Sequence, residues 1–505
     1  MYWVSSVKYM FRGNFLDIWL DDEEQYRRAL YFGEAHLSYT VRRYLPRENT
    51  FTEEVVRRYW GYPDSLKLRT FRGLWPRVKR FFGLEAKPYC EIDFDEREVK
   101  FLRDYQLDAL CHILTQMEEC GCSSLQAATG AGKTEVAVAV YKTVKPNKCF
   151  FLSLNTDLLI QAKQRFQKYG EEAGLINKDH FEVDAPVVCC TVQTLYRALM
   201  EAERIENPYV TDEELDEEVQ GLLEETPVQD KLELAKAYRE AELVIIDEIQ
   251  HVPARTVWTC AIANAEALRL GLSATPWRDD NRDLDIYCAT GEPVPRKITS
   301  SELVRRGYLV PAEITFVHYR PPWADKYSWQ RGSAQLYMKV KRELYSDPMR
   351  NRLIARLAEL APKPFLCLVK EVKHGELLLR EMRRKGLNVA FVYGALDPDL
   401  RARIFNAIRA GRLDGIIATT LADEGLDLPA LRSLIIAGGG KSSTRALQRV
   451  GRIVRPYPGK EVGVVYDVWD EVRFFADHAR RRERIYSTEP GWKIRHVRAA
   501  FRGGS

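Results

Sequence analysis

The chain has no apolar run that approaches the roughly 20 residues a membrane-spanning helix needs. Its first residues, MYWVSSVKYMFRG, also lack the long apolar block of a secretory signal. No Cys-x-x-Cys pair is matched by a second pair or by spaced histidines, which argues against a zinc or iron–sulfur site. We therefore expect an intracellular protein with no membrane partner, whose ten cysteines are buried, reduced thiols.

Net charge is also small, at +4 for 505 residues, but it is unevenly spread. Residues 1–90 carry 16 lysines and arginines against 11 acidic residues, whereas residues 201–240 carry 4 against 14. A basic chain with one segregated acidic segment fits a protein that binds a polyanion. Apolar residues at helical spacing within 211–227 predict that the acidic segment is a surface helical insertion, and docking of a partner protein is its alternative role.

Short apolar runs alternate with helical stretches in two blocks of the chain. The runs lie at 149–154, 187–192, 243–246 and 268–273 in the first block, and at 364–369, 388–393, 415–420, 434–438 and 463–468 in the second. Buried parallel strands are continuously apolar, because helices cover both faces of their sheet. The pattern therefore predicts an α/β fold with two tandem, doubly wound parallel sheets.

Residues 1–92 differ from both blocks, because they are rich in aromatic residues and arginine and have few long apolar runs. They predict a small basic α+β domain. Within residues 67–83, cations interleave with phenylalanine and tryptophan, which leaves two interpretations open. In one, the segment contacts nucleic acid through phosphates and stacked bases, with Lys79 and Arg80 among the contacts. In the other, it is a packing segment with its aromatic side chains inward.

A phosphate-binding loop is predicted at residues 127–134, AATGAGKT, which follow the Walker A spacing with alanine at the first glycine position. The glycines let backbone N–H groups turn toward phosphates, and the helix that follows points its positive end at the anion. Lys133 would reach the β and γ oxygens, and Thr134 would supply a hydroxyl to Mg²⁺. The ATP contacts are expected from Thr129, Gly130, Ala131, Gly132, Lys133 and Thr134.

Two adjacent carboxylates follow the apolar run LVII at residues 243–246. Taken alone, Asp247 and Glu248 are typical of a strand that surfaces in an acidic turn. Together with a phosphate loop, the pair indicates a catalytic site. Asp247 could hold Mg²⁺ through water, and Glu248 could orient and deprotonate the attacking water.

With these segments the chain resembles the superfamily 2 helicases and translocases, over residues from Leu102 to about Tyr466. In that resemblance LRDYQ, at 102–106, is the adenine-reading motif, with Gln106 on the adenine edge and Arg103 nearby. Thr156 and Thr191 fall in the strand-contacting motifs Ia and Ib. GLSATPWRDD, at 271–280, is similar to the coupling motif III. The coupling residues implied are Gln250, Ser273 and Thr275.

The second block resembles the second half of the superfamily 2 helicases. ATTLADEGLDLP, at 418–429, is similar to motif V, and QRVGRIVRP, at 448–456, to motif VI. The resemblance implies that Arg452 and Arg455 add positive charge at the γ-phosphate and that Gln448 positions water or phosphate. It also implies nucleotide contacts from Gly425 and Asp427 and a nucleic-acid contact from Thr419.

DEIQ and SATPWRDD resemble the DNA-directed group that contains XPB and UvsW, whereas RNA helicases of the DEAD-box type differ at these places. The resemblance implies RecA-like domains at 93–298 and 351–505, a linker or reduced thumb-like element at 299–350, and a basic tail. It further implies a DNA-dependent ATPase that unwinds or branch-migrates duplex, forked or branched DNA, with 3′ to 5′ polarity. The alternatives are a duplex translocase and a motor subunit of a nuclease, restriction or repair complex. No PD-(D/E)xK nuclease signature is present.

Overall fold

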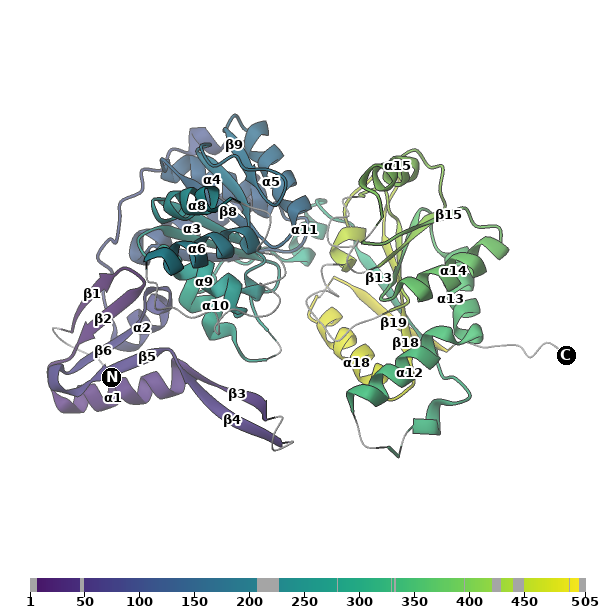
Figure 1. Ribbon diagram of the computed structural model, residues 1–505, viewed down its shortest axis with the longest axis horizontal. Helices are drawn as coiled ribbons and strands as arrows, with labels where there is room; N and C mark the ends of the chain where they lie inside the picture. Colours follow the sequence, from purple (N-terminus) through teal and green to yellow (C-terminus); the bar gives the residue numbers. More distant parts are fainter. Residues whose placement is uncertain are drawn as a thin grey trace. The chain divides into compact units, whose positions relative to one another are not determined.

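The computed structural model divides the chain into two compact units, Met1–Ala127 with Gly132–Ile298, and Ala128–Ala131 with Thr299–Ser505 (Figure 1). None of its described helices is long and apolar enough to cross a membrane. The structure describes residues 7–45, 50–206, 227–278, 280–327, 329–330, 333–394, 396–419, 428–438, 449–489 and 491–498.

The first unit begins with a four-stranded antiparallel sheet of order β1-β2-β6-β5. Apolar residues of its strands pack with α1 and α2 in one core cluster, so these helices cover one face of the sheet. A separate hairpin, β3–β4, extends away from it (Figure 1). The elements are β1 (Lys8–Arg12), β2 (Phe15–Trp19), α1 (Glu23–His36), β3 (Ser38–Leu45), β4 (Thr50–Arg57), β5 (Tyr59–Tyr62), β6 (Lys67–Phe71) and α2 (Trp75–Phe82).

A six-stranded parallel sheet of order β7-β12-β11-β8-β10-β9 forms the rest of the first unit. Its strands are β7 (Cys122–Gln126), β8 (Cys149–Ser153), β9 (Ala173–Ile176), β10 (Val187–Thr191), β11 (Leu243–Asp247) and β12 (Leu268–Ser273). Its helices are α3 (Asp104–Cys120), α4 (Lys133–Val144), α5 (Thr156–Lys168), α6 (Val192–Glu206), α8 (Val228–Arg239), α9 (Arg255–Ala263) and α10 (Asp283–Thr290). All four strands expected in this block are confirmed.

The N-terminal sheet and the parallel sheet share one buried core, to which Leu68 and Val78 contribute from one side and Cys122 and Leu284 from the other. The Arg72 side chain is fully buried, donates to Cys122 Sγ at 3.2 Å and to the Tyr89 hydroxyl at 2.6 Å, and also donates to the Ala267 carbonyl. The N-terminal residues therefore pack into the first unit as one body.

Much of the 67–83 segment serves this packing. Trp75 and Phe82 are buried, Lys79 Nζ pairs with Glu119 Oε1 of α3 at 2.7 Å, and Arg77 pairs with Glu292. Of the cations in α2, Arg80 is the exposed one. The inward-packing interpretation thus holds for this helix, because Trp75 packs on Tyr9 and Phe11 of β1 and the two phenylalanines pack on Phe32 of α1.

The ends of the acidic segment 201–240 belong to two helices of the core. Leu234, Ala235 and Tyr238 of α8 are buried in the cluster that also holds Leu195 and Leu199 of α6. Residues 207–226, which carry most of the acidic side chains, lie outside the described residues.

The second unit contains a seven-stranded parallel sheet of order β15-β16-β14-β17-β18-β13-β19. Its strands are β13 (Ala312–Tyr319), β14 (Phe365–Val369), β15 (Val389–Val392), β16 (Gly415–Thr419), β17 (Ser433–Ile436), β18 (Gly463–Asp470) and β19 (Lys493–Arg498). Its helices are α11 (Ser300–Arg305), α12 (Ala334–Ser346), α13 (Pro348–Leu360), α14 (Val372–Arg384), α15 (Pro398–Arg409) and α18 (Phe475–Tyr486). The α/β fold with two tandem parallel sheets is confirmed.

Two strands of this sheet were not expected. β13 falls inside the segment 299–350 that was assigned to a linker or thumb-like element, and it pairs with β18 and β19. β19 comes from the basic tail and forms an edge of the sheet. Its alternating charged and apolar residues are typical of a surface strand. Its position in the sheet follows from its pairing with β13, about 180 residues earlier in the chain.

All ten cysteines are free thiols, and eight of them are buried. Cys90 is half-buried and Cys111 is exposed. Burial raises the pKa of Cys190 and Cys367, so these thiols stay protonated near neutral pH.

Candidate active site

The phosphate loop connects the end of β7 to the start of α4 in the first parallel sheet. Gly130 and Gly132 have φ values of +84° and +83°, in the left-handed region that glycine adopts without strain. A Cβ atom at Gly132 would lie 2.3 Å from Gln106 Nε2, so the loop has no room for a side chain there. The predicted glycine-dependent turn is therefore formed, and α4 begins at Lys133 directly after it.

Gln106 and Arg103 lie at the start of α3, against this loop. Gln106 Oε1 accepts from the Arg103 amide at 2.9 Å, and its Nε2 donates to the Gly132 carbonyl at 3.4 Å. Gln106 is buried, and the Arg103 guanidinium donates to the Tyr105 hydroxyl at 3.0 Å. Of the residues expected to read adenine, Gln106 thus bonds to the phosphate loop directly, and Arg103 is held beside it through its bond to Gln106.

Asp247 and Glu248 stand at the carboxyl end of β11, between β12 and β8. Asp247 Oδ1 accepts from the Glu248 amide at 3.0 Å, and Glu248 has a left-handed backbone with φ of +56°. Burial and the neighbouring Glu248 carboxylate raise the pKa of Asp247 to about 7, while the Lys133 ammonium opposes that shift. Two carboxylates at one strand end are costly unless a cation shares them.

A hydrogen-bonded chain joins Glu248 to the end of β12. Gln250 Nε2 donates to Glu248 Oε2 at 2.6 Å, and the Ser273 hydroxyl donates to Gln250 Oε1 at 2.6 Å. Ser273 Oγ in turn accepts from the Thr275 amide at 2.9 Å. Gln250, Ser273 and Thr275 are all buried, so these hydrogen bonds form a continuous path from Glu248 to residues 273–275 away from solvent. The three residues expected to couple are in contact.

The same segment is tied to both the carboxylate turn and the phosphate loop. Arg278 Nη1 donates to the Gln250 carbonyl at 2.8 Å, and the guanidinium forms a two-pronged pair with Asp280. The Ala127 amide, at the start of the loop, donates to the Ser273 carbonyl at 2.9 Å. These two contacts were not foreseen from the sequence, because neither is encoded by neighbours in the chain.

Two of the expected nucleic-acid contacts lie on the same edge of this sheet. Thr156 is the first residue of α5, which follows β8, and Thr191 is the last residue of β10, which pairs with β8. Thr191 Oγ1 donates to Thr194 Oγ1 at 2.7 Å.

In the second unit, Arg452 and Arg455 are half-buried residues just after the described helical turn begins at 449, and Thr419 ends β16 as a buried residue. The Thr419 hydroxyl has no hydrogen-bond partner among the described residues. Gln448, Gly425 and Asp427 lie outside the described residues.

The residues present fit a magnesium-bound nucleotide. The glycine turn and the start of a twelve-residue helix form an anion cradle, and Lys133 adds a cation. Thr134 and Asp247 would hold Mg²⁺, because a hydroxyl and a carboxylate are oxygen ligands of the kind that ion prefers. A divalent cation would also offset the repulsion between Asp247 and Glu248.

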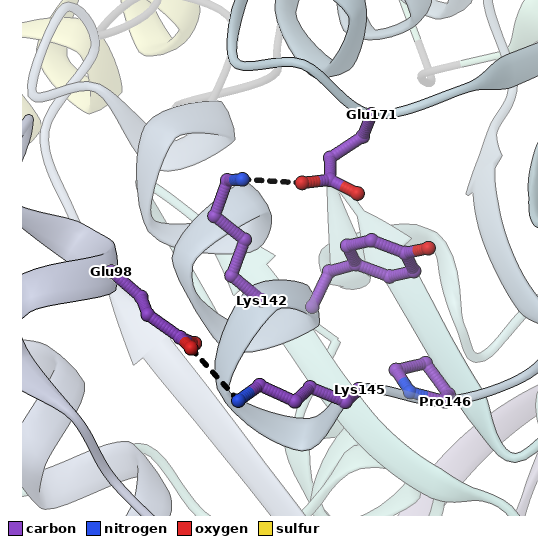
Figure 2. Close-up of a pocket in the computed structure, with 6 residues that line it drawn as sticks. Glu98, Lys142, Lys145, Pro146 and Glu171 are labelled. Carbon is purple, nitrogen blue, oxygen red and sulfur yellow. Dashed lines mark hydrogen bonds and ion pairs between the residues drawn. The ribbon is translucent and has the colours of Figure 1, made fainter.

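A separate pocket lies at the far end of α4 and is not part of this site. It is lined by Glu98, Tyr141, Lys142, Lys145, Pro146 and Glu171 (Figure 2). Lys145 Nζ pairs with Glu98 Oε1 at 2.9 Å, and Lys142 pairs with Glu171. Twelve helical residues rise by about 18 Å, at 1.5 Å each, so the pocket is remote from the phosphate loop.

A phosphate loop beside paired carboxylates, followed by a second parallel sheet, defines a nucleotide-binding α/β protein with two parallel-sheet domains. The family described as "Type III restriction enzyme, res subunit" matches residues 100–278, and "Helicase conserved C-terminal domain" matches residues 350–457. The chain is accordingly a superfamily 2 helicase, an ATP-hydrolysing enzyme. Within that superfamily it resembles the XPB and UvsW group.

Individual relatives agree with this assignment. Helicase 22, a candidate helicase of Sulfolobus islandicus filamentous virus, is 26% identical over 90% of this chain and 78% of its own length. The DNA 3′-5′ translocase XPB2 of Sulfurisphaera tokodaii is 25% identical over 76% of this chain and 84% of its own. The fragment of a type I restriction enzyme HsdR subunit from Vibrio vulnificus has the same fold, with a TM-score of 0.53 and 16% identity over 94% of this chain and 82% of that chain.

Proposed function

We propose that this protein uses ATP hydrolysis to move along DNA and to unwind or branch-migrate duplex, forked or branched substrates. The observation that carries the proposal is the hydrogen-bonded chain from Glu248 through Gln250 to Ser273. A simple ATPase needs the carboxylate alone. A motor also needs a rigid link from that carboxylate to a segment that responds to the nucleotide, and this chain of contacts provides one.

Hydrolysis is assigned to residues of both units. Glu248 orients and deprotonates the attacking water, while Lys133 neutralises charge on the phosphates. Arg452 and Arg455 are proposed to add charge at the γ-phosphate, with Gln448 beside them. Gly425 and Asp427 are proposed to contact the nucleotide. If hydrolysis requires residues of both units, the two units would close on each other only while ATP is bound. Hydrolysis of that ATP would then let them open again.

The proposed track is DNA, because the relatives named above include a DNA translocase and because DEIQ at 247–250 differs from the DEAD sequence of RNA helicases. The name of that translocase also supports 3′ to 5′ movement. Thr156, Thr191 and Thr419 are proposed strand contacts. Arg80 remains a proposed contact on α2, while Lys79 would first have to leave Glu119. The acidic segment 201–240 is a proposed protein-docking element.

ATPase stimulation across nucleic acids tests this proposal. Turnover is measured with single-stranded, duplex, forked and four-way DNA, with RNA of the same sequence as the control. We expect DNA to stimulate turnover and forked or four-way DNA to be separated in an ATP-dependent strand-displacement assay. Equal stimulation by RNA, or no stimulation by any DNA, would contradict the proposal.

A motor that moves on duplex DNA without separating strands is the second candidate. The description of the matching family as a restriction-enzyme subunit and the HsdR-like fold favour it. In that case duplex DNA stimulates turnover, a triplex-forming strand is displaced from the duplex, and forked DNA stays paired. A nuclease that co-purifies with the chain would further support this role.

A further inference from the structure

The N-terminal sheet has one largely open face, opposite the face that α1 and α2 cover; at its margin the buried Phe71 packs on Trp258 of α9. Strand register places three rows of side chains on this open face. The first row runs across the strands as Lys8, Trp19, Lys67 and Tyr62, the second as Met10, Asp17, Arg69 and Trp60, and the third as Arg12, Phe15 and Phe71. Aromatic and cationic side chains therefore alternate on one surface.

The charge of this face is strongly positive, because three cations, Arg69, Lys67 and Arg12, surround one carboxylate and Lys8 adds a fourth cation on the same face. Asp17 is fully buried and accepts a two-pronged pair from Arg69, at 2.6 and 2.7 Å. Lys67 and Arg12 lie 3.8 and 3.9 Å from the same carboxylate. Asp17 thus holds the cations in place while neutralising only one of them. An anionic partner would meet an excess of positive charge.

Two rings of this face, in the first and second rows, are accessible, and cations lie beside the rings of the first row. Trp60 and Tyr62, on the edge strand β5, keep 41% and 38% of their surface exposed. The Lys67 ammonium lies 4.3 Å from the centre of the Tyr62 ring, and the Arg12 guanidinium lies 5.9 Å from that of Trp19. Each ring can stack on a flat base while the neighbouring cation meets the phosphate of the same nucleotide.

We infer that the open face of the N-terminal sheet is a binding platform for a single strand of nucleic acid. A duplex presents phosphates to such a surface but keeps its bases stacked inside, so it would leave Trp60 and Tyr62 without partners. An unpaired strand uses both the rings and the cations. The choice of nucleic acid as the polyanion rests on the proposed function, in which an unwinding motor produces single strands beside this domain.

Strand affinity of the full chain tests the platform directly. Fluorescence anisotropy with a labelled 20-nucleotide oligothymidine, in the absence of ATP, compares the wild type with the double variant Trp60→Ala and Tyr62→Ala. Since base stacking on an aromatic ring is worth about 1–3 kcal/mol, the double variant should bind at least about tenfold more weakly. Unchanged affinity would overturn the inference.

Two further variants control for folding and for nonspecific loss of aromatic surface. Tyr31→Ala removes a ring that is 78% exposed on α1, away from the open face, and should leave affinity within about twofold, the size of an ordinary surface change. The pair Trp60→Phe and Tyr62→Phe keeps the rings and should retain most of the binding. If the phenylalanine pair binds as weakly as the alanine pair, stacking is not the cause.

An abasic strand and a duplex test whether binding to the open face depends on unpaired bases. An abasic 20-mer should bind the wild type about as weakly as oligothymidine binds the alanine pair, and the alanine pair should not discriminate between the two. A 20-base-pair duplex should be bound equally by both proteins. Equal loss of duplex and single-strand binding would show that the face is an electrostatic surface instead.

The salt dependence of oligothymidine binding tests the cations separately. Arg12→Ala should lower the slope of log K against log salt by about 0.7, the value for one phosphate contact on a single strand. Arg27→Ala, on the exposed side of α1, is the matched control and should leave the slope unchanged. An unchanged slope in Arg12→Ala would remove that residue from the platform.

The outcomes separate this inference from the proposed function. Strand binding that depends on Trp60 and Tyr62, together with ATP turnover that no DNA stimulates, would support the platform and reject the motor. DNA-stimulated turnover together with normal strand binding by the alanine pair would support the motor and reject the platform.

Discussion

The two sheets of the first unit present their functional side chains in different ways. The parallel sheet is buried on both faces, and its reactive residues, such as Asp247 and Ser273, stand at the carboxyl ends of β11 and β12. The antiparallel sheet is covered by α1 and α2 on one face, and its cations and rings, such as Arg69 and Trp60, lie across the other face, where α9 packs at the margin.

This difference follows from how each sheet is connected. Parallel strands need crossover helices, which cover both faces and leave only the strand ends and loops for chemistry. Antiparallel strands are joined by short turns, so a face can remain open to a long, flat ligand. The parallel sheet therefore suits a compact phosphate site, and the antiparallel sheet suits an extended strand.

Lys133→Ala should have the largest effect on the strand-end site. Loss of the ammonium at the phosphates should lower ATP turnover by about 1,000-fold, as for other preorganised charges at a transition state. Steady-state phosphate release measures this. Lys142→Ala, at the other end of the same helix and paired with Glu171, is the matched control and should turn over ATP normally. Retained turnover in Lys133→Ala would move the nucleotide site away from residues 127–134.

Glu248→Gln should separate binding from chemistry at the same edge. The amide cannot take a proton from water, so turnover should fall by about 100-fold, the usual contribution of general base catalysis, while nucleotide affinity remains. A fluorescent ATP analogue measures affinity, and phosphate release measures turnover. Glu242→Gln changes a carboxylate beside the opposite end of β11 and serves as the control. A Glu248→Gln protein with normal turnover would exclude this residue as the base.

Gln250→Ala should affect coupling more than hydrolysis. The change removes two hydrogen bonds that link Glu248 to Ser273, each with a net value of about 1 kcal/mol, so strand displacement per ATP hydrolysed should fall by roughly fivefold or more. Strand displacement and phosphate release are measured on the same sample. Gln167→Ala, an exposed residue of α5, is the control. A proportional loss of both activities would indicate structural damage in place of uncoupling.

Asp17→Asn should test the antiparallel sheet without touching the strand-end site. Burial alone would raise the pKa of Asp17, but its hydrogen bonds and charge interactions with Arg69, Lys67 and Arg12 outweigh burial and hold the pKa below 3.8. The folded state therefore gains stability from the ionised carboxylate above this pH and loses it as the pH falls below 3.8.

The amide should lower the free energy of unfolding near neutral pH by about 2 kcal/mol, because hydrogen bonds to a charged group are lost. Denaturant unfolding at pH 7 and near pH 3 measures both effects, and the difference between variant and wild type should shrink in acid. A difference that is independent of pH would remove the ion pair as the cause.

Local sequence motifs predicted where the phosphate loop and the carboxylate pair lie in the fold, while the roles of their residues stay predictions. The phosphate loop and the carboxylates each lie within a few consecutive residues, so their geometry is set by short-range backbone constraints such as the left-handed glycines at 130 and 132. Strands β8, β10, β11 and β12 were also foreseen, because each is a continuous apolar run. The assignments at Gln448, Gly425 and Asp427 stay predictions, since these residues lie outside the described part of the chain.

Surface and interface roles could not be predicted in the same way. In the segment 67–83, cations and aromatic residues interleave throughout the sequence. In the structure, however, Arg72 lies in the core and Arg69 lies on the open face. Lys79 was expected to touch nucleic acid, but it pairs with Glu119 of a helix about 40 residues away. Each outcome depends on which distant element covers the residue.

The sequence by itself determined the two parallel sheets, the phosphate loop and the carboxylate pair, because apolar runs and short motifs act over a few neighbouring residues. Only the tertiary structure decided that β13 and β19 join the second sheet, that Gln250 bridges Glu248 to Ser273, and that rings and cations share one open face. These features rest on register and packing between segments far apart in the chain. Alternation within a strand sets which side chains share a face, but packed helices decide which face stays open.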